Sequence, residues 1–215
     1  MFFNSYQHSY CVITPLAKVF RLSLVGYLVL CVSLLNAAPT GGVVTNGNAQ
    51  IIKNGVITDI NQQSQKASIN WQGFGIAPSE TVNFNQPNSN ALTLNRVIGN
   101  ERSVIEGALN ANGKVFIINS NGVLFTKGSS VNTAGLVAST LDISDENFNS
   151  NNFVFNSAIS SENSVINLGT IKVADGGYIA LLGEKVANEG VLIANKGTVA
   201  LNSGDKITLN FNGNS

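Results

Sequence analysis

Beyond residue 38, the chain alternates between short apolar runs and polar breaks. Runs such as AQIIKNGVITDI, ASINWQGFGI and GKVFIINSNGVLF are rich in Val, Ile, Leu and Phe, and Gly, Asn or Ser bounds each of them. Between Ser79 and Gly99, Val82 and Phe84 and then Leu92 and Leu94 are two positions apart, which is the period of a β-strand and not of a helix. The pattern predicts an all-β protein built from many short strands.

The C-terminal part of the chain repeats itself with an offset of 21 residues. NLGTIKVADGGYIALLGEKV starts at Asn167 and is similar to NEGVLIANKGTVALNSGDKI, which starts at Asn188. The aligned pairs are Asn167 with Asn188, Gly169 with Gly190, Gly176 with Gly197, Gly183 with Gly204, and Glu184–Val186 with Asp205–Ile207. Such a period indicates a solenoid, because one unit cannot bury its apolar face alone.

Stacking these units as coils predicts a right-handed parallel β-helix, which is a single-stranded solenoid with about three strands in each coil. Rows of Val, Ile and Leu would then fill the interior, and Asn residues at the corners would form hydrogen-bonded ladders. An antiparallel sandwich with similar strand lengths is the alternative fold. The constant offset of the repeat favours the solenoid.

Two segments depart from the repeating pattern. The segment Val43–Gly75, which contains Trp71, is predicted to form an N-terminal cap, because an uncovered solenoid end is prone to aggregation. The segment Thr140–Asn163 is acidic and rich in Asn around the run FVF. We expect it to leave the helix as a β excursion, and a hairpin lying on the side of the helix is one form it could take.

Residues 1–38 are a different kind of sequence. Lys18 and Arg21 precede the uncharged run Leu22–Leu35, and small residues follow it. A basic flank, an apolar run shorter than the roughly 18 residues of a membrane span, and a small-residue boundary predict a secretory signal peptide rather than a transmembrane anchor. The mature domain would then occupy residues 39–215, with no stable membrane anchor after cleavage.

Cleavage after Ala37 or Ala38 would remove His8, Cys11 and Cys31, which are the only imidazole and thiol groups of the chain. Packing, rather than disulfides, must then stabilise the domain. Charged residues make up 11% of the chain and its formal net charge is +0, so the sequence lacks the basic stripe of a nucleic-acid-binding protein. No cofactor is expected.

The densest acidic cluster in the sequence is formed by Asp142, Asp145 and Glu146. Polysaccharide-cleaving enzymes need opposed carboxylates, and calcium loops need carboxylates at fixed spacings. The cluster matches neither requirement and lies in a segment predicted to be a solvated loop. The sequence therefore argues against an enzyme and against a metal site.

The segment Phe84–Ile143 carries three motifs. They are Asn119, Ser120, Asn121, Gly122 and Val123; Asn85, Gln86, Pro87 and Asn88 within FNQPN; and Gly135 and Leu136 within GLVAST. This segment resembles the N-terminal secretion domain of filamentous-haemagglutinin-type (TpsA-like) exoproteins of two-partner secretion. Ser120 replaces the proline of the family's Asn-Pro-Asn-Gly signature, Thr126 replaces a common Gly, and Thr133-Ala134 replaces a commoner Val-Gly.

The resemblance implies a route and a partner. The exoprotein would cross the inner membrane of a Gram-negative bacterium by its signal peptide. An outer-membrane β-barrel transporter with periplasmic domains would then recognise the secretion domain, which would nucleate β-helix folding at the cell surface. In the family, adhesion or toxicity usually lies in a longer downstream region that contacts host or neighbouring cells. The alternative is an adhesin domain that itself binds such surface ligands.

The turn Asn119–Gly122 has two interpretations, as a structural tight turn or as a surface that the transporter recognises. As a turn, it would use the side chain of Asn119 as one hydrogen-bond acceptor, and Gly122 would adopt a conformation unfavourable for other residues. Loss of that one bond in Asn119→Ala would cost about 0.5–1.5 kcal/mol, which leaves the domain folded. We expect residues 85–88 to form a structural loop, and residues 135–140 to form a core strand.

Overall fold

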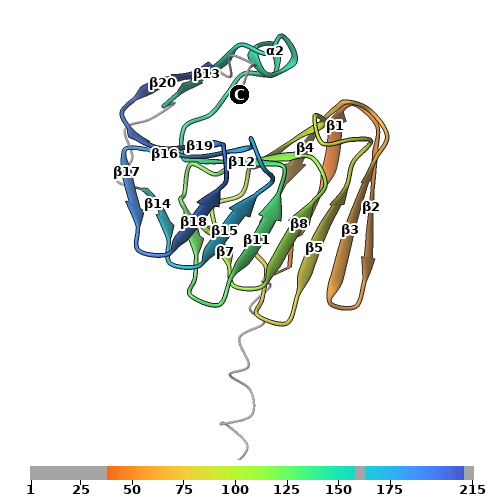
Figure 1. Cartoon of the computed structure of the whole chain (residues 1–215). Helices are drawn as coiled ribbons and strands as arrows, with labels where there is room; N and C mark the ends of the chain where they lie inside the picture. The colour runs from red at the N-terminus through yellow and green to blue at the C-terminus, as the bar shows by residue number, and fades with distance from the viewer. Residues whose placement is uncertain (1–37, 158–162, 211–215) are drawn as a thin grey trace, which may run out of the picture. The chain divides into compact units, whose positions relative to one another are not determined.

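The structure is a computed structural model that describes residues 38–157 and 163–210, so residues 1–37 of the predicted signal peptide lie outside the described residues. Three mainly parallel sheets form the walls of a solenoid (Figure 1). Sheet 1 contains β1 (Val43–Asn46), β4 (Lys66–Trp71), β6 (Leu92–Val97), β9 (Lys114–Ile118), β12 (Gly135–Ser139), β16 (Tyr178–Gly183) and β19 (Thr198–Ser203). Sheet 2 contains β2 (Ala49–Asn54), β3 (Ile57–Gln62), β5 (Thr81–Asn85), β8 (Ala108–Ala111), β11 (Ser130–Thr133), β15 (Thr170–Val173) and β18 (Val191–Ala194). Sheet 3 contains β7 (Ser103–Ile105), β10 (Val123–Phe125), β14 (Ser164–Asn167) and β17 (Lys185–Asn188).

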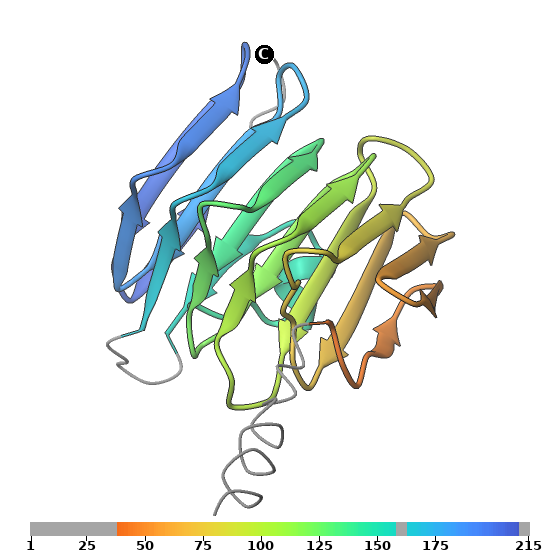
Figure 2. The ribbon, with the colours of Figure 1, turned by 90° about the horizontal axis from the view of Figure 1, so that it is seen from below.

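From β7 onward each coil runs through sheet 3, sheet 2 and sheet 1 in turn, whereas the earlier coils formed by β3–β4 and β5–β6 have strands only in sheets 2 and 1. Strands of successive coils pair in parallel, as β9 with β12 and β12 with β16 do (Figure 2). This arrangement follows because the chain advances by one strand spacing, about 4.8 Å, in each coil. The prediction of a parallel β-helix is therefore confirmed, and the antiparallel sandwich is wrong.

Aligned apolar rows fill the interior of the solenoid. In one row, Val115 of β9 lies beside Leu136 of β12, which lies beside Ile179 of β16. All three side chains are fully buried. Burying each such side chain contributes about 1.5–3 kcal/mol, so the rows supply the main stabilisation of a domain whose described residues contain no disulfide-forming side chain.

The N-terminal cap is confirmed, but it is shorter than predicted. β1 pairs antiparallel with β4, and β2 pairs antiparallel with β3, whereas β3 and β4 pair in parallel with the strands that follow. Only β1 and β2 therefore close the end, and β3 and β4 already belong to the first coil. Trp71 lies inside that coil, where its Nε1 donates a hydrogen bond to Oδ1 of Asn95 (3.0 Å).

The C-terminal repeat has its predicted register in sheets 2 and 3. Asn167 lies beside Asn188, and the Nδ2 of Asn167 donates to the Oδ1 of Asn188 at 2.7 Å. Gly169 and Gly190 are also neighbours, because a Cβ on Gly190 would lie 2.2 Å from the carbonyl oxygen of Gly169. These two predicted pairs, and the corner ladder of Asn side chains at this position, are confirmed.

The register shifts by one residue in sheet 1. Tyr178 lies beside Thr198 and Gly183 lies beside Ser203, so the offset there is 20 residues. The predicted pairs Gly176 with Gly197 and Gly183 with Gly204 are therefore wrong. The reason is a shorter corner, since one residue fewer separates β18 from β19 than separates β15 from β16.

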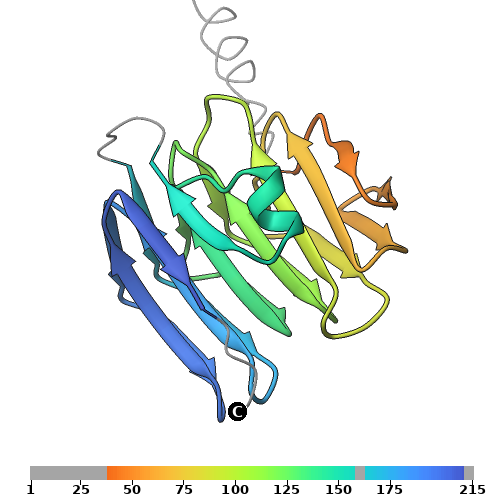
Figure 3. The same ribbon diagram turned by 90° about the horizontal axis from the view of Figure 1, so that it is seen from above.

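The predicted excursion leaves the solenoid after β12 and carries helix α2 (Asp145–Asn149) and strand β13 (Phe153–Asn156). Its described residues form no two-stranded hairpin of their own, only the single antiparallel bridge between Asp142 and Asn156. Instead, β13 pairs antiparallel with β20 (Lys206–Leu209), and both lie over one face of sheet 1 (Figure 3). The predicted stacking of residues 205–207 on residues 184–186 is therefore wrong.

A second apolar core explains why β20 leaves the solenoid. The outward side chains of sheet 1 include Leu94, Phe116 and Val137, which are fully buried under the excursion. The Phe116 ring contacts Phe148 of α2 at a centroid distance of 6.1 Å and Phe153 of β13 at 5.5 Å. Strands of sheet 1 are thus apolar on both faces and need a cover on each side.

The last described coil leaves part of the interior open to solvent. Val199 and Leu201 continue interior rows, because they lie beside Ile179 and Leu181, yet each is 43% exposed. The two ends of the described solenoid therefore differ, since strands close one end and apolar side chains are accessible at the other. The described part of the chain has no helix with the length and apolar character needed to cross a membrane.

The shortened corner predicts a stabilising substitution. Lys196 has a left-handed backbone (φ 51°) at a corner where the preceding coil places Gly176 (φ 75°). A left-handed conformation costs a non-glycine residue about 1–2 kcal/mol, and glycine gives back about 0.5–1 kcal/mol of this through its chain entropy. Lys196→Gly should raise the free energy of unfolding in urea by about 0.5–1 kcal/mol. Lys196→Ala is the control and should bring no gain; a glycine variant no more stable than the wild type would contradict the corner geometry.

Candidate partner-recognition site

The motif residues lie at two corners of the solenoid, and the structure does not bring them together. The turn Asn119–Gly122 joins β9 in sheet 1 to β10 in sheet 3, whereas residues 86–91 join β5 in sheet 2 to β6 in sheet 1. Sheet 1 separates the two corners, and β9 with its 5 residues is roughly 16 Å long. A single small contact cannot cover both motifs.

Asn119 is wholly buried and holds its corner together. Its Nδ2 donates to the carbonyl oxygen of Glu101 and to Oγ of Ser103, both at 2.9 Å, and its Oδ1 accepts from the backbone N–H of Asn121 at 2.9 Å. Its own N–H donates to the carbonyl oxygen of Ser139 at 2.9 Å. One residue thus links the same corner in three successive coils.

The rest of the turn is built around this amide. The N–H of Gly122 donates to the carbonyl oxygen of Asn119 at 2.9 Å, and Gly122 has a φ of 103°. Val123 is buried and starts β10. The acceptor role of Asn119 and the unusual conformation of Gly122, both expected from the sequence, are confirmed.

The exposed part of the turn is small. Ser120 is exposed, and its carbonyl oxygen accepts from Nδ2 of Asn163 at 2.8 Å. Asn121 is half-buried, and its Nδ2 donates to the carbonyl oxygen of Gly99 at 3.0 Å. A partner that binds the folded turn would therefore contact mainly Ser120.

The expected cost of Asn119→Ala was too small, because the sequence gives no sign that this side chain is buried with three hydrogen bonds rather than one. Truncation would leave the carbonyl of Glu101, the hydroxyl of Ser103 and the N–H of Asn121 without their partner. The Ser103 hydroxyl is buried, so leaving it unsatisfied costs about 1–3 kcal/mol, and each of the two part-buried bonds contributes about 0.5–1.5 kcal/mol; the loss is therefore about 3 kcal/mol.

A second buried amide, Gln86, holds the other corner. Its Nε2 donates to the carbonyl oxygens of Ala91 (3.2 Å) and Lys114 (3.1 Å) and to Oγ1 of Thr93 (3.0 Å). Its Oε1 accepts from the N–H of Gly113 at 2.9 Å. The sequence placed this residue in a loop motif, but nothing in the pattern showed that it is the centre of a buried network.

The other residues of this motif face solvent. Asn85 is exposed, and its Nδ2 donates to Oδ1 of Asn61 at 2.8 Å. Pro87 and Asn88 are also exposed, and Oδ1 of Asn88 accepts from the N–H of Asn90 at 2.9 Å. The loop is thus pinned inside by Gln86 and presents residues 87–90 on the surface.

Gly135 and Leu136 begin β12 at the same corner as this loop. Leu136 is part of the interior core. A Cβ on Gly135 would lie 3.3 Å from both Lys114 and Tyr178, so a larger side chain would displace them. Both residues therefore serve packing in the folded domain.

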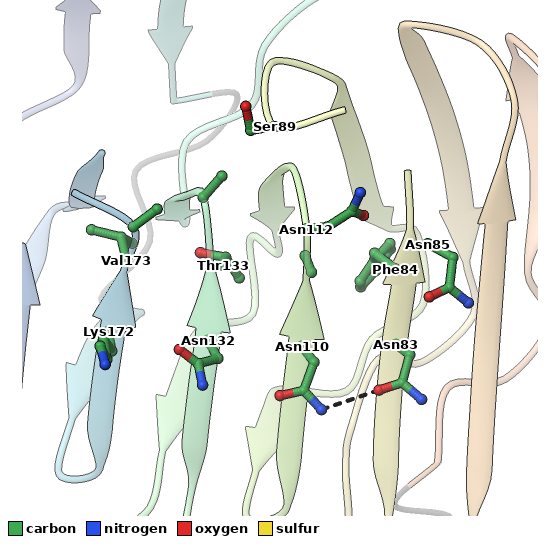
Figure 4. A pocket seen from close by; sticks show the side chains of 13 residues that line it. Asn83, Phe84, Asn85, Ser89, Asn110, Asn112, Asn132, Thr133, Lys172 and Val173 are labelled. Atoms are coloured by element: carbon green, nitrogen blue, oxygen red, sulfur yellow. Dashed lines mark hydrogen bonds between the residues drawn. The ribbon is translucent and has the colours of Figure 1, made fainter. Parts of the chain in front are cut away.

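An open groove of about 460 Å³ crosses the outer face of sheet 2 beside the loop (Figure 4). Its floor carries Asn83, Asn110, Asn132 and Lys172 on adjacent strands. Nδ2 of Asn110 donates to Oδ1 of Asn83 at 3.1 Å. The Asn ladder expected at corners thus also occurs on a strand face, which the spacing of Asn residues did not show.

The acidic cluster anchors the excursion. The Nε and Nη1 of Arg96 lie 2.9 Å from carboxylate oxygens of Asp142 and Asp145 respectively, and Glu146 is exposed. Burial lowers the pKa of Arg96, but the two carboxylates outweigh it and raise that pKa above its ordinary value. No group of three or more His, Cys, Asp or Glu residues within 38–157 and 163–210 is placed to hold a metal ion.

Comparisons with known proteins agree with the motifs. Two relatives are named heme/hemopexin-binding protein. One, from Haemophilus influenzae strain Rd, is 39% identical over 159 residues, which cover 71% of this chain and 17% of the relative. The other, from Haemophilus influenzae, is 48% identical over 96 residues, or 45% of this chain and 10% of the relative. The chain therefore corresponds to a small fraction of either protein.

The fold has a solved counterpart in the HMW1 secretion domain from Haemophilus influenzae. The two structures agree with a TM-score of 0.76 at 41% identity, over 80% of this chain and 46% of that chain. The model of the TPS secretion domain family matches residues 35–215. Because this match extends over most of the sequence, the chain belongs to the TPS secretion domain family, as its resemblance to TpsA-type exoproteins indicated.

Proposed function

We propose that this domain directs an exoprotein to its outer-membrane β-barrel transporter, which recognises it in the periplasm, and that it then nucleates β-helix folding at the cell surface. Exoproteins of two-partner secretion pass through the outer membrane, and membership of the family supports the same route here. The family is one of secretion domains and not of enzymes, which supports a role without catalysis.

The difference between the two ends of the solenoid is the observation that best supports nucleation. β1 and β2 cover the first coil, whereas Val199 and Leu201 remain partly exposed on the last described coil. A further coil stacked there would remove this apolar surface from water, which contributes roughly 25 cal/mol for each Å². A folded domain of this kind offers a template on which an emerging chain gains stability coil by coil.

Burial decides which motif residues a partner can reach. Asn119 and Gln86 are buried, so in the folded domain they act by holding their corners. Ser120 and the loop residues 87–90 are exposed at those corners. We infer that recognition of the folded domain uses these exposed residues, and that the buried amides fix their positions.

A substitution of Ser120 tests whether the transporter contacts the turn. Ser120→Arg places a large charged side chain on the exposed part of the turn and breaks no side-chain hydrogen bond of the described structure, so the domain should fold normally. Export with the barrel partner should fall by roughly tenfold or more, as expected when an interface residue costs over 1 kcal/mol. Secreted protein is measured by immunoblot and folding by circular dichroism.

The matched control is Ser130→Arg, which changes an exposed serine on sheet 2. Normal export of Ser120→Arg would rule out recognition through this turn.

A substitution of Asn119 tests whether its side chain stabilises the fold. Asn119→Ala should lower the free energy of unfolding by about 3 kcal/mol. Ser120→Pro should raise it by about 0.4–1 kcal/mol, because the N–H of Ser120 donates no hydrogen bond to another described residue and proline restricts the unfolded chain. Urea denaturation measures both. A loss under 1 kcal/mol for Asn119→Ala would show that its hydrogen bonds contribute little to the fold.

The alternative function, direct binding of a host ligand, is favoured by one observation. Both relatives are named for binding heme and hemopexin, although this chain corresponds to 17% and 10% of their lengths. A pull-down with the purified domain separates the two functions. Capture of the transporter's periplasmic domains supports secretion targeting, and capture of hemopexin instead supports the adhesin-type alternative.

A further inference from the structure

A cavity of about 370 Å³ lies where the excursion meets sheet 1, at the edge of the second apolar core. Lys66 of β4 and Lys114 of β9 line it, and both lie beside Leu92 of β6, which is between them in the sheet. The two lysines are therefore two strand spacings apart, roughly 10 Å along the solenoid. Phe153 of β13 and Leu209 of β20 supply apolar surface on the excursion side.

The lysines have polar and aromatic neighbours but no counter-ion among the described residues. Nζ of Lys66 donates to the carbonyl oxygens of Phe148 and Asn149, both at 2.8 Å. Nζ of Lys114 lies 5.7 Å from the ring centre of Tyr178. The described residues that line the cavity include no Asp or Glu. Burial lowers the pKa of Lys66 and that of Lys114 below their ordinary value.

Arg96 provides an internal comparison on the same face of sheet 1. The excursion places Asp142 and Asp145 within 2.9 Å of its guanidinium group. To Lys66 the same excursion brings two backbone carbonyls and the ring of Phe148, whose centre lies 5.4 Å from Nζ, and its described residues that line the cavity around Lys114 are all neutral. Partly buried cations without a counter-charge are unfavourable, and an anion from solution would relieve that cost.

We propose that this cavity binds a small organic anion, with a carboxylate or phosphate group between Lys66 and Lys114 and an apolar part against Leu92, Phe153 and Leu209. The volume is at the lower end of the range for small-molecule sites, so the ligand is about the size of a single substituted ring. A ligand there would contact both the solenoid and the excursion and would hold them together.

The test uses the purified chain, with benzoate as the probe and benzyl alcohol as its neutral counterpart, at constant ionic strength. Benzoate should raise the midpoint of thermal unfolding in a saturable way, because it binds only the folded state, and benzyl alcohol should not. In NMR titrations, the side-chain signals of Lys114 in the unmodified chain should move with benzoate. Inorganic phosphate should bind at the same place more weakly, because it lacks the apolar part.

Lys114→Met should weaken benzoate binding by roughly tenfold or more, and Lys114→Arg should retain it. Lys172→Met is the matched control, since Lys172 is an exposed lysine on sheet 2, and it should bind as the wild type does. Equal stabilisation by benzyl alcohol, unchanged binding by Lys114→Met, or an absence of NMR shifts at Lys114 would overturn the proposal. The NMR measurement decides the matter even if the methionine variant does not fold.

Discussion

Every feature of this domain depends on turning the chain at each corner of a coil without leaving backbone groups unpaired. Within a strand, the neighbouring coils satisfy the N–H and C=O groups, but at a corner the ladder is interrupted. At the two motif corners, buried amide side chains supply the hydrogen bonds that the ladder lacks. Asn119 joins three successive corners on one edge of sheet 1, and Gln86 joins backbone groups on the other edge. An amide suits this task because one side chain donates and accepts at once.

The buried and the exposed residues of the three motifs have different roles. Asn119 and Gln86 are buried and hold corners, Val123 and Leu136 are buried in the core, and the exposed motif residues are Asn85, Pro87, Asn88 and Ser120. Sheet 1 lies between the two corners, and its outer face is covered by Phe148 and Phe153 of the excursion and by Ile207 of β20. The same cover leaves the cavity lined by Lys66 and Lys114, so the proposed recognition surface and the proposed ligand site both lie along sheet 1.

The sequence predicted the architecture well because its signals are local and repeated. Alternation at every second residue and the recurrence of Asn167 at Asn188 determine the strands and their parallel stacking. Contacts between distant segments were harder to predict. The pairing of β13 with β20 depends on the apolar outer face of sheet 1, and a repeat read along the chain gives no sign of it. Likewise, Asn119 and Asn88 are both Asn residues in turn motifs, yet one is wholly buried and the other exposed.

Amide hydrogen exchange at the Asn119 corner tests the central claim most directly. If buried hydrogen bonds hold this corner, the N–H groups of Asn119, Asn121 and Gly122 should open only with global unfolding. Their protection, measured by NMR under native conditions, should then equal that of Val137 in the neighbouring core strand. Exchange as fast as at the exposed turn residues Lys127 and Gly128 would contradict the account, because the corner would then open without unfolding the coil.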